Sequence, residues 1–164
     1  MANTFTVGTG GIFTTIQQAI DNFVVQPGDT LVLLGGTFVE DVNFSKALNI
    51  VGAKVGVDGV DGSRDAAGGT GESTLIGNHT ITATGPVTID GVRFLNDATT
   101  TGGGASSPIL LIANGNDHVV TNSIFYSTVQ GGGVDDRAIM MGPIASGHVT
   151  ISDNYLTGAH PNAF

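Results

Sequence analysis

Histidine and carboxylate side chains are the groups in this chain that could bind a metal, because the sequence contains no cysteine. His118, His148 and His160 are candidate ligands, since neutral imidazole is a common ligand of transition metals. His118 and His148 flank predicted strands about one repeat apart, and no glutamate or cysteine completes a ligand set around them. The favoured interpretation is therefore a stack of turn residues rather than a metal site.

Glu40 and Asp41 are adjacent carboxylates, and paired carboxylates can perform the acid–base chemistry of glycoside hydrolysis. No second acid is expected at the same height in a neighbouring coil, so both side chains are predicted to face solvent. Tyr126 and Tyr155 are the candidates for stacking on a sugar ring, the role that aromatic platforms play in carbohydrate sites. With two tyrosines and no tryptophan, the chain offers little for an aromatic sugar-binding groove.

The segment Asp135-Asp136-Arg137 is the place where a cation directly adjoins two acids, and Asp117 lies earlier in the chain, next to His118. Such a set could support acid–base chemistry, but a short run of opposite charges is also common on protein surfaces. A 31-residue repeat in the chain places the segment opposite residues that are predicted to form a loop. The favoured interpretation of this segment is a solvated turn.

The composition excludes several classes of partner. The 164 residues carry 5 Lys and Arg against 14 Asp and Glu, which gives a net charge of −9. Nucleic-acid binding needs clustered cations, so no nucleic-acid partner is expected. No apolar run approaches the roughly 20 residues of a membrane-spanning helix, so no membrane insertion is expected, and residues 1–11 lack the pattern of a secretory signal. A hydrophobic content of 40% predicts a folded domain, expected to be a single one over 1–164.

One helix is expected near the start of the chain, followed by short strands. Over 14–23, the apolar residues Ile16, Ala19, Ile20 and Phe23 follow the i, i+3, i+4, i+7 spacing of an amphipathic helix. The glycine-rich stretch 52–72 has almost no large apolar residue and is predicted to be a loop extruded from the strands. The predicted strands, each bounded by Gly, Asn, Asp or Pro, are 30–34, 37–44, 47–51, 73–76, 80–83, 87–94, 109–113, 118–125, 138–141 and 149–156.

The second half of the chain repeats with a period of 31 residues. Three sets of residues recur at this interval: Ile89, Val120 and Ile151; Phe94, Phe125 and Leu156; and the turn-forming Gly91, Asn122 and Asp153. The same shift places Ile109 and Leu110 opposite Met140 and Met141. A repeat with several short strands and no helix predicts a β-solenoid, in which each strand pairs with its equivalent one coil further on. About five rungs are expected over 31–164, after an N-terminal cap over 1–30.

The N-terminal half of the chain resembles a known family. The segments that carry the resemblance are Phe13-Thr14-Thr15-Ile16-Gln17-Gln18-Ala19-Ile20-Asp21, Pro27-Gly28-Asp29-Thr30-Leu31, Gly36-Thr37-Phe38-Val39-Glu40 and Lys46-Ala47-Leu48-Asn49-Ile50-Val51-Gly52. They resemble the cap and first rungs of right-handed parallel β-helix proteins of the pectate-lyase-like superfamily, over roughly 8–95. The resemblance implies an all-β fold in which one N-terminal α-helix covers the open end of a right-handed parallel β-helix. It says little about activity, because this scaffold serves lyases, hydrolases, adhesins and surface-layer proteins alike.

Polysaccharide lyases of this family, as the resemblance implies, take the proton α to a uronate carboxylate with an Arg or Lys, while Ca²⁺ neutralises that carboxylate. By this resemblance Arg137 is the candidate catalytic base, and Asp117, Asp135 and Asp136 are the candidate calcium ligands. The substrate would be an acidic polysaccharide.

Two functions therefore stay open. The first is a non-catalytic module of a secreted or cell-surface bacterial protein, serving as a rigid or adhesive scaffold, which the acidity and the lack of a convergent catalytic cluster favour. The second is the N-terminal fragment of a Ca²⁺-dependent polysaccharide lyase or uronate epimerase. Residues 159–164 stop part-way through a predicted rung, so the C-terminal end is expected to contact further rungs or another subunit. In both cases the expected location is outside the cell or at its surface.

Overall fold

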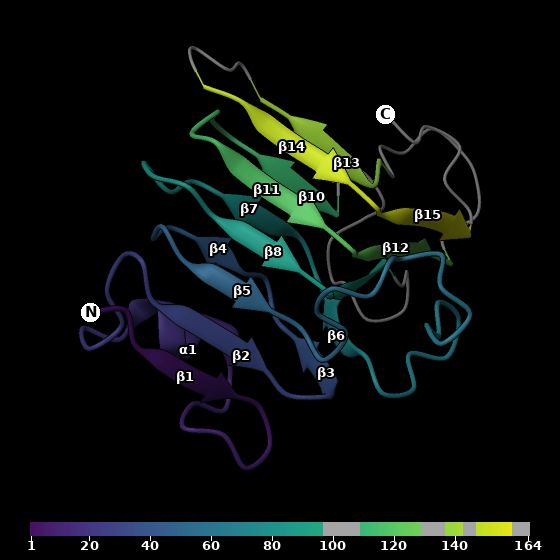
Figure 1. The fold of residues 1–164 in the computed structure, drawn as a ribbon, viewed down its shortest axis with the longest axis horizontal. Coiled ribbons are helices and arrows are strands. Elements are labelled where there is room, and N and C mark those ends of the chain that lie inside the picture. Colours follow the sequence, from purple (N-terminus) through teal and green to yellow (C-terminus); the bar gives the residue numbers. More distant parts are fainter. Residues whose placement is uncertain (97–108, 129–136, 143–146, 159–164) are drawn as a thin grey trace.

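We describe the fold from a computed structural model, in which residues 1–96, 109–128, 137–142 and 147–158 are placed well enough to describe. Within these ranges the chain forms one short helix and fifteen strands (Figure 1). Every strand pairing in them is parallel. The prediction of an all-β fold with a single helix near the N-terminus is confirmed for the described part of the chain.

The strands form three parallel sheets. Sheet A consists of β1 (Thr4–Val7), β2 (Thr30–Leu33), β5 (Asn49–Val51), β8 (Thr88–Asp90), β11 (His118–Thr121) and β14 (Val149–Ser152). Sheet B consists of β3 (Gly36–Val39), β6 (Ser73–Ile76), β9 (Arg93–Asn96), β12 (Ile124–Ser127) and β15 (Tyr155–Gly158). Sheet C consists of β4 (Asn43–Phe44), β7 (His79–Ile81), β10 (Leu110–Ile112) and β13 (Ile139–Met141).

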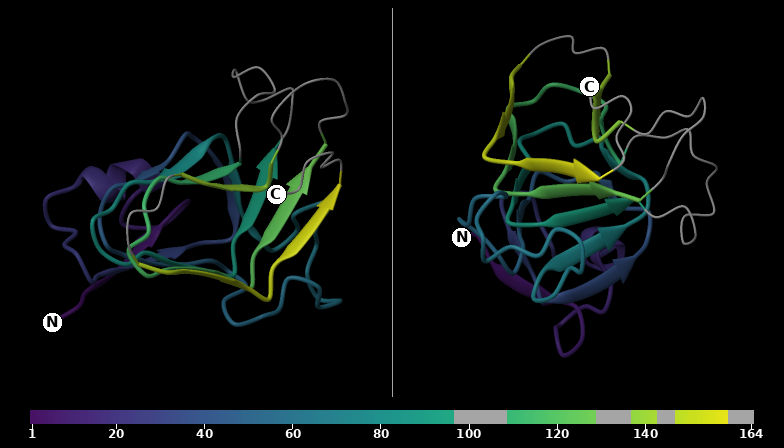
Figure 2. Two further views of the ribbon diagram at one scale, coloured as in Figure 1. Left: turned by 90° about the horizontal axis from the view of Figure 1, so that it is seen from above. Right: turned by 90° about the vertical axis from the view of Figure 1, so that its right-hand side faces the viewer.

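The chain visits the sheets in the order A, B, C and then returns to sheet A one strand further on. We call each such passage a rung: β2, β3 and β4 form the first rung, and β14 and β15 belong to the fifth. Figure 2 shows the sheets arranged around a common interior. This path is compatible with a parallel β-helix. The strand β1, which pairs with β2 from below, was not expected from the sequence.

The 31-residue repeat is confirmed in sheets A and B. In sheet A, Val120 pairs with Ile89 on one side and Ile151 on the other. In sheet B, Phe94 and Phe125 pair, and their rings stack with centroids 4.7 Å apart. Four of these five side chains are fully buried, and Ile151 in the fifth rung is 38% exposed. The repeat therefore places equivalent apolar residues above one another in one core.

The turn residues of the repeat mark the corner between sheets A and B. Gly91, Asn122 and Asp153 have φ values of 72°, 48° and 55°, in the left-handed region that Gly, Asn and Asp adopt most easily. The strands predicted across these residues are each broken here into two strands of different sheets. The strand predicted over 37–44 is likewise divided into β3 and β4. The turn residues recur visibly in the sequence, but the change of sheet does not, because apolar residues continue on both sides of each turn.

In sheet C the 31-residue repeat holds between β7 and β10, where His79 pairs with Leu110, but not between β10 and β13. Leu110 pairs with Ile139, an offset of 29 residues (139 − 110), and the other pairs of β10 and β13 share this offset. The predicted alignment of Ile109 and Leu110 with Met140 and Met141 is therefore wrong. The strands β9 and β12 keep the offset of 31, so the connection from β12 to β13 is two residues shorter than the connection from β9 to β10. The strands β11 and β14 also keep it, so the connection from β13 to β14 is two residues longer than the connection from β10 to β11.

The helix α1 (Ile16–Asp21) covers the lower end of the core. It buries Ile16, Ala19 and Ile20 against the first rung, as predicted. Phe23, the fourth residue of the predicted stripe, is 83% exposed because the helix ends at Asp21 and the chain turns away. The helix is therefore shorter than the predicted 14–23, and its apolar face has three members.

Side chains near α1 also satisfy the backbone at the lower edge of sheet C and at the end of the helix. The backbone N–H of Asn43, in the edge strand β4, donates to Gln17 Oε1 at 2.8 Å. Lys46 Nζ donates to the carbonyls of Asn22 and Val25, at 2.9 and 2.8 Å. These contacts satisfy backbone groups that an uncovered edge or helix end would leave unpaired.

Candidate functional site

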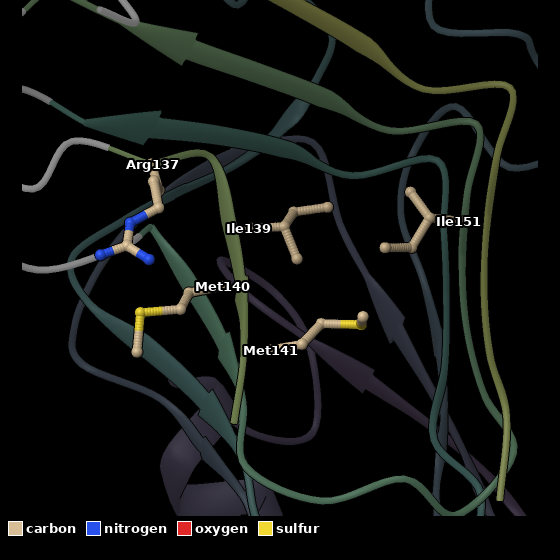
Figure 3. A pocket seen from close by; sticks show the side chains of 5 residues that line it. All are labelled: Arg137, Ile139, Met140, Met141 and Ile151. Carbon is tan, nitrogen blue, oxygen red and sulfur yellow. The ribbon is translucent and has the colours of Figure 1, made fainter. Parts of the chain in front are cut away.

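A cavity of about 210 Å³ lies beside β13 and β14, in the fourth and fifth rungs (Figure 3). Its lining consists of Arg137, Ile139, Met140, Met141 and Ile151. Ile139 and Met141 lie on the side of β13 that faces Ile151, whereas Arg137 and Met140 lie on the opposite side. The cavity therefore reaches from the interior of the stack around β13.

Among the described residues, the lining gives this cavity one cation and four apolar side chains. Arg137, the predicted catalytic residue, is thus placed at a cavity, and none of its described lining residues is a carboxylate. A guanidinium among apolar groups can hold an anion next to an apolar surface. It cannot by itself hold Ca²⁺, which takes oxygen ligands.

Asp117 does not line this cavity. It lies just before β11, where its Oδ1 accepts a hydrogen bond from the backbone N–H of His148 at 3.1 Å. His148 Nδ1 lies 3.5 Å from the same oxygen, and both side chains are largely exposed. A stack of turn residues was predicted at His118 and His148. In the structure the stacked turn residues are Asp117 and His148, while His118 pairs with Val149.

The calcium site predicted from the resemblance is not assembled by the described residues. Asp135 and Asp136, like His160, lie outside the described ranges. Within those ranges, no group of three or more His, Asp or Glu side chains is arranged to hold a metal ion. Calcium binding by Asp117, Asp135 and Asp136 therefore stays a prediction.

Glu40 and Asp41 hold backbone groups instead of facing each other across a site. Glu40 accepts hydrogen bonds from the backbone N–H groups of Ile16 and Gln17, at 2.8 and 2.9 Å, at the start of α1. Asp41 Oδ1 accepts from the backbone N–H of Asn78 in the next rung at 2.8 Å. Asp41 is exposed, but Glu40 is half-buried, so the expectation that both face solvent is wrong for Glu40. The free N–H groups of the first helical turn attract its carboxylate.

The two tyrosines lie in neighbouring rungs of sheet B. Tyr155 is 37% exposed, and Tyr126 is half-buried with the Arg93 guanidinium carbon 5.5 Å from its ring centroid. One face of Tyr126 is therefore in contact with a protein cation. This placement leaves Tyr126 less available as a stacking surface for a sugar ring.

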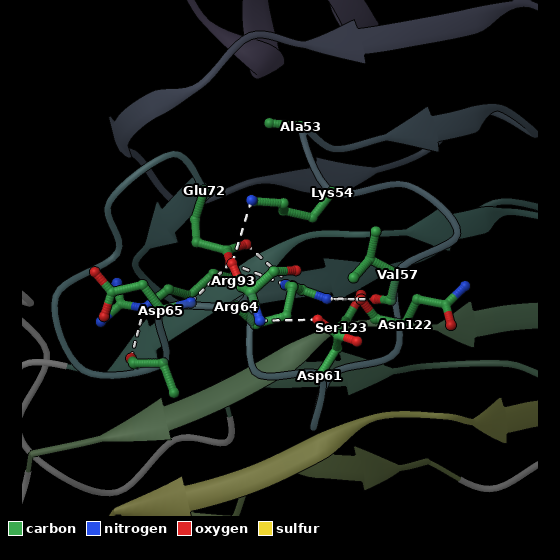
Figure 4. Close-up of polar contacts among 12 residues, drawn as sticks. Ala53, Lys54, Val57, Asp61, Arg64, Asp65, Glu72, Arg93, Asn122 and Ser123 are labelled. Atoms are coloured by element: carbon green, nitrogen blue, oxygen red, sulfur yellow. Dashed lines mark hydrogen bonds and ion pairs between the residues drawn. The ribbon is translucent and has the colours of Figure 1, made fainter.

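The main polar cluster of the described chain lies in a segment that the sequence analysis treated as an extruded loop (Figure 4). We call residues 52–72 the clasp loop. Arg64 forms a two-pronged ion pair with Glu72, with Nε–Oε1 and Nη2–Oε2 distances of 2.8 and 3.0 Å. Arg64 Nη1 also donates to the carbonyls of Val57 and Asn122, each at 2.7 Å. The side chains of Arg64 and Glu72 are 1% and 0% exposed.

The clasp loop contacts three rungs beyond its own. It leaves β5 in the second rung, and the N–H of Gly52 donates to the carbonyl of Asp90 in the third rung at 2.8 Å. Arg64 reaches Asn122 in the fourth rung, and the N–H of Gly59 donates to the carbonyl of Asp153 in the fifth rung at 3.0 Å. The loop thus adds no strand to the sheets, but it ties their A–B corner together along its length.

Arg93 in β9 holds the outer part of the clasp loop. Its Nε and Nη2 donate to the carbonyls of Ala66 and Ala67, at 2.8 and 3.0 Å. Burial lowers the pKa of Arg93, although the nearby carboxylates of Asp65 and Glu72 oppose this effect. Contacts between cations and loop carbonyls could not be read from the sequence. The available signal was that Arg64 and Arg93 are two of only five cations in the chain.

Hydrogen bonds within the clasp loop also fix its acidic side chains. The carboxylate of Asp65 accepts from the backbone N–H of Thr70 at 2.9 Å and of Gly68 at 2.8 Å. These bonds lower the pKa of Asp65. Asp65 therefore stabilises a turn of the loop and is not poised as an acid or base.

No family model, curated protein or solved structure matches this chain. The resemblance to the pectate-lyase-like superfamily consequently rests on the motifs in the first half of the sequence. Among the described residues, no helix has the length and apolar character needed to cross a membrane.

Proposed function

We propose that this chain is a rigid, non-catalytic module of a secreted or cell-surface bacterial protein, built as a right-handed parallel β-helix of the pectate-lyase-like kind. The observation that carries the proposal is that buried charged side chains form their hydrogen bonds and ion pairs within the chain itself. In the described ranges, the buried Asp, Glu and Arg side chains are Asp29, Arg64, Glu72 and Arg93, and each bonds to the chain's own backbone or to another of the four. A catalytic centre instead directs such groups at a cleft.

Asp29 illustrates this use. Its two carboxylate oxygens accept hydrogen bonds from the backbone N–H groups of Asn3 and Gln26, at 2.7 and 2.8 Å. These bonds lower the pKa of Asp29, so the carboxylate stays ionised and holds the N-terminal strand to the first rung. A scaffold of stacked strands needs such contacts, because each rung is stabilised mainly by its neighbours.

The proposal is tested by combining hydrogen exchange with an activity assay. We expect the amides of β5, β8 and β11 to exchange only through global unfolding, as in a rigid scaffold. We also expect the chain to release no unsaturated product from uronate polymers in the presence of Ca²⁺, followed by absorbance. Fast exchange in these central strands would contradict the scaffold role, and so would product release that is lost in Arg137→Ala.

The alternative proposal is the N-terminal part of a Ca²⁺-dependent polysaccharide lyase or uronate epimerase. The observation that favours it is the position of Arg137 on the cavity, where a guanidinium could meet an acidic sugar. Calcium, when bound in such enzymes, neutralises the substrate carboxylate, and Arg137 would take the α-proton. The same assay decides between the two functions, and Arg137→Lys serves as the control because it keeps a cation that could act as a base.

An end-to-end contact at the fifth rung belongs to the first proposal. Met141 in the fourth rung is 53% exposed, and Ile151 and Tyr155 in the fifth are 38% and 37% exposed, in the last strands of the three sheets. The outer edge of a last strand favours pairing with further rungs or with another subunit. Sedimentation velocity of the chain tests the second of these partners: a dimer that Ile151→Glu dissociates indicates another subunit, and a monomer at all concentrations contradicts it.

A further inference from the structure

His79 is a polar residue in the apolar core. It lies in β7 with 1% of its surface exposed, pairs with Leu110, and packs against the ring of Phe94 at a centroid distance of 5.5 Å. Its Nδ1 accepts a hydrogen bond from the backbone N–H of Val42, in the rung below, at 3.3 Å. Its Nε2 is buried and has no hydrogen-bond partner among the described residues.

His118 makes the same kind of contact two rungs higher. It is the first residue of β11 and is also 1% exposed. Its Nδ1 accepts from the backbone N–H of Val87, in the rung below, at 3.1 Å. Its Nε2 lies 3.0 Å from Asn114 Oδ1, which can accept a hydrogen bond. Two separate pairs of rungs are thus joined by an imidazole that accepts from a backbone N–H.

This geometry defines the protonation state of both rings. An imidazole nitrogen accepts a hydrogen bond only when it carries no proton, so the hydrogen of each neutral ring is on Nε2. If Nδ1 took up a proton, two donors would face each other, and the buried N–H of Val42 or Val87 would lose its acceptor. A buried backbone donor without an acceptor destabilises the folded state.

We propose that His79 and His118 are acid-sensitive joints, which hold adjacent rungs together only while Nδ1 is unprotonated. Proton uptake in mildly acidic surroundings releases the first rung from the second and the third from the fourth. The proposal is independent of whether the chain is a scaffold or part of an enzyme, because it concerns contacts inside the stack. It makes the stability of the module depend on the acidity of its surroundings.

Charged groups near the two rings favour the protonated imidazole, but burial favours the neutral imidazole more strongly. Asp41, next to Val42, favours the protonated form of His79, while β9 and β10 place the apolar Phe94 and Leu110 against it. Burial nevertheless lowers the pKa of His79 from 6.5 to about 4. The unfolded chain therefore binds a proton that the folded chain excludes. Stability is complete above about pH 6.5 and falls as the pH decreases toward 4.

The pKa of His118 is shifted in the same direction as the pKa of His79. Burial lowers the pKa of His118, against the opposing effects of Asn114 and the charge of Asp117. His148 shares the carboxylate of Asp117, so it is the other titratable group at this turn. Backbone hydrogen bonds lower the pKa of Asp29 and Asp65 below their ordinary value of 3.8, so these two carboxylates do not titrate between pH 7 and 5.

The test is urea unfolding of the full chain at pH 7 and pH 5. For the wild type, His79 alone is expected to increase the unfolding equilibrium constant about 20-fold between these pH values. In His118→Asn, the amide Oδ1 replaces Nδ1 as a non-titrating acceptor, so the dependence becomes weaker, and in the double variant with His79→Asn it is largely lost. His148 is exposed, so His148→Asn is the matched control, and we expect it to keep the full pH dependence of stability.

A pH-independent wild type, or a double variant that retains the full dependence, would overturn the proposal. A measurement on the wild type covers the case in which His79→Asn does not fold. Nuclear magnetic resonance of the ring nitrogens at pH 7 should show both rings as the Nε2–H tautomer, with His79 unprotonated at pH 5. An Nδ1–H tautomer for either ring contradicts the proposed joints.

Discussion

The corner covered by the clasp loop and the last two rungs each contain an arginine, and the two arginines have different surroundings. Arg64 is fully buried, pairs with Glu72 and reaches two backbone carbonyls. Arg137 borders a cavity whose other described lining side chains are apolar. Arg64 donates hydrogen bonds to the loop carbonyl of Val57 and the corner carbonyl of Asn122. In a regular strand, such carbonyls accept hydrogen bonds from the neighbouring strand instead. A cation can therefore be buried in this stack where the chain turns.

The largest expected difference between the two regions is in core packing. Phe125→Ala in the fourth rung removes a fully buried ring that stacks on Phe94, and should reduce the free energy of unfolding by about 4 kcal/mol. Leu156→Ala, one rung higher in the same column, should cost about 1 kcal/mol because Leu156 is only partly buried. Urea unfolding measures both values. Equal losses would mean that the fifth rung is packed as tightly as the fourth.

A smaller difference is expected between the two arginines. Arg64→Gln leaves the buried carboxylate of Glu72 without its partner and should cost about 3 kcal/mol. Arg137→Gln, in a half-buried position beside the cavity, should cost less than about 1 kcal/mol. Thermal and urea unfolding of the two variants at pH 7 measure the comparison. If Arg137→Gln proved as costly as Arg64→Gln, the last rungs would depend on buried charge as the clasped corner does.

The smallest of the three effects concerns two glycines of the clasp loop. A Cβ on Gly59 would lie 2.7 Å from the backbone N of Tyr155 and 2.8 Å from the backbone O of Ser123, so Gly59→Ala should cost about 2 kcal/mol. A Cβ on Gly62 would meet no atom within 4 Å, which makes Gly62→Ala the matched control with little expected effect. Hydrogen exchange of β14 and β15 should increase in Gly59→Ala alone. Unchanged exchange there would show that the loop does not stabilise the fifth rung.

The repeating part of the fold could be predicted from the sequence because its residues perform two simple tasks. The apolar Ile89 and Val120 recur at the interval that brings them into register, and Asn122 and Asp153 recur where the backbone needs a left-handed turn. Both tasks restrict the residue type strongly, so the 31-residue period is visible in the amino-acid sequence. The connections on both sides of β13 differ in length from those on both sides of β10, and this is why the predicted alignment of β10 with β13 failed.

The candidate site was less predictable, for a different physical reason. Glu40 and Arg64 act on backbone groups that are distant in sequence, such as the N–H of Ile16 and the carbonyl of Asn122. Backbone groups are the same at every residue, so a contact with them leaves no pattern in the sequence. The charged segment with Arg137 was interpreted as a solvated turn, because the apolar side chains beside Arg137 are brought there only by the placement of the rungs above one another.

The hydrogen bond from Gly59 to Asp153 joins residues that are 94 positions apart (153 − 59), whereas paired strands of adjacent rungs join residues between 19 (49 − 30) and 39 (88 − 49) positions apart. During synthesis, each rung can pair with the preceding one as soon as it emerges. The clasp loop must wait until the fifth rung has been made, so its closure is a late step in folding. A nascent chain therefore adds 94 residues after Gly59 before the acceptor of its N–H exists.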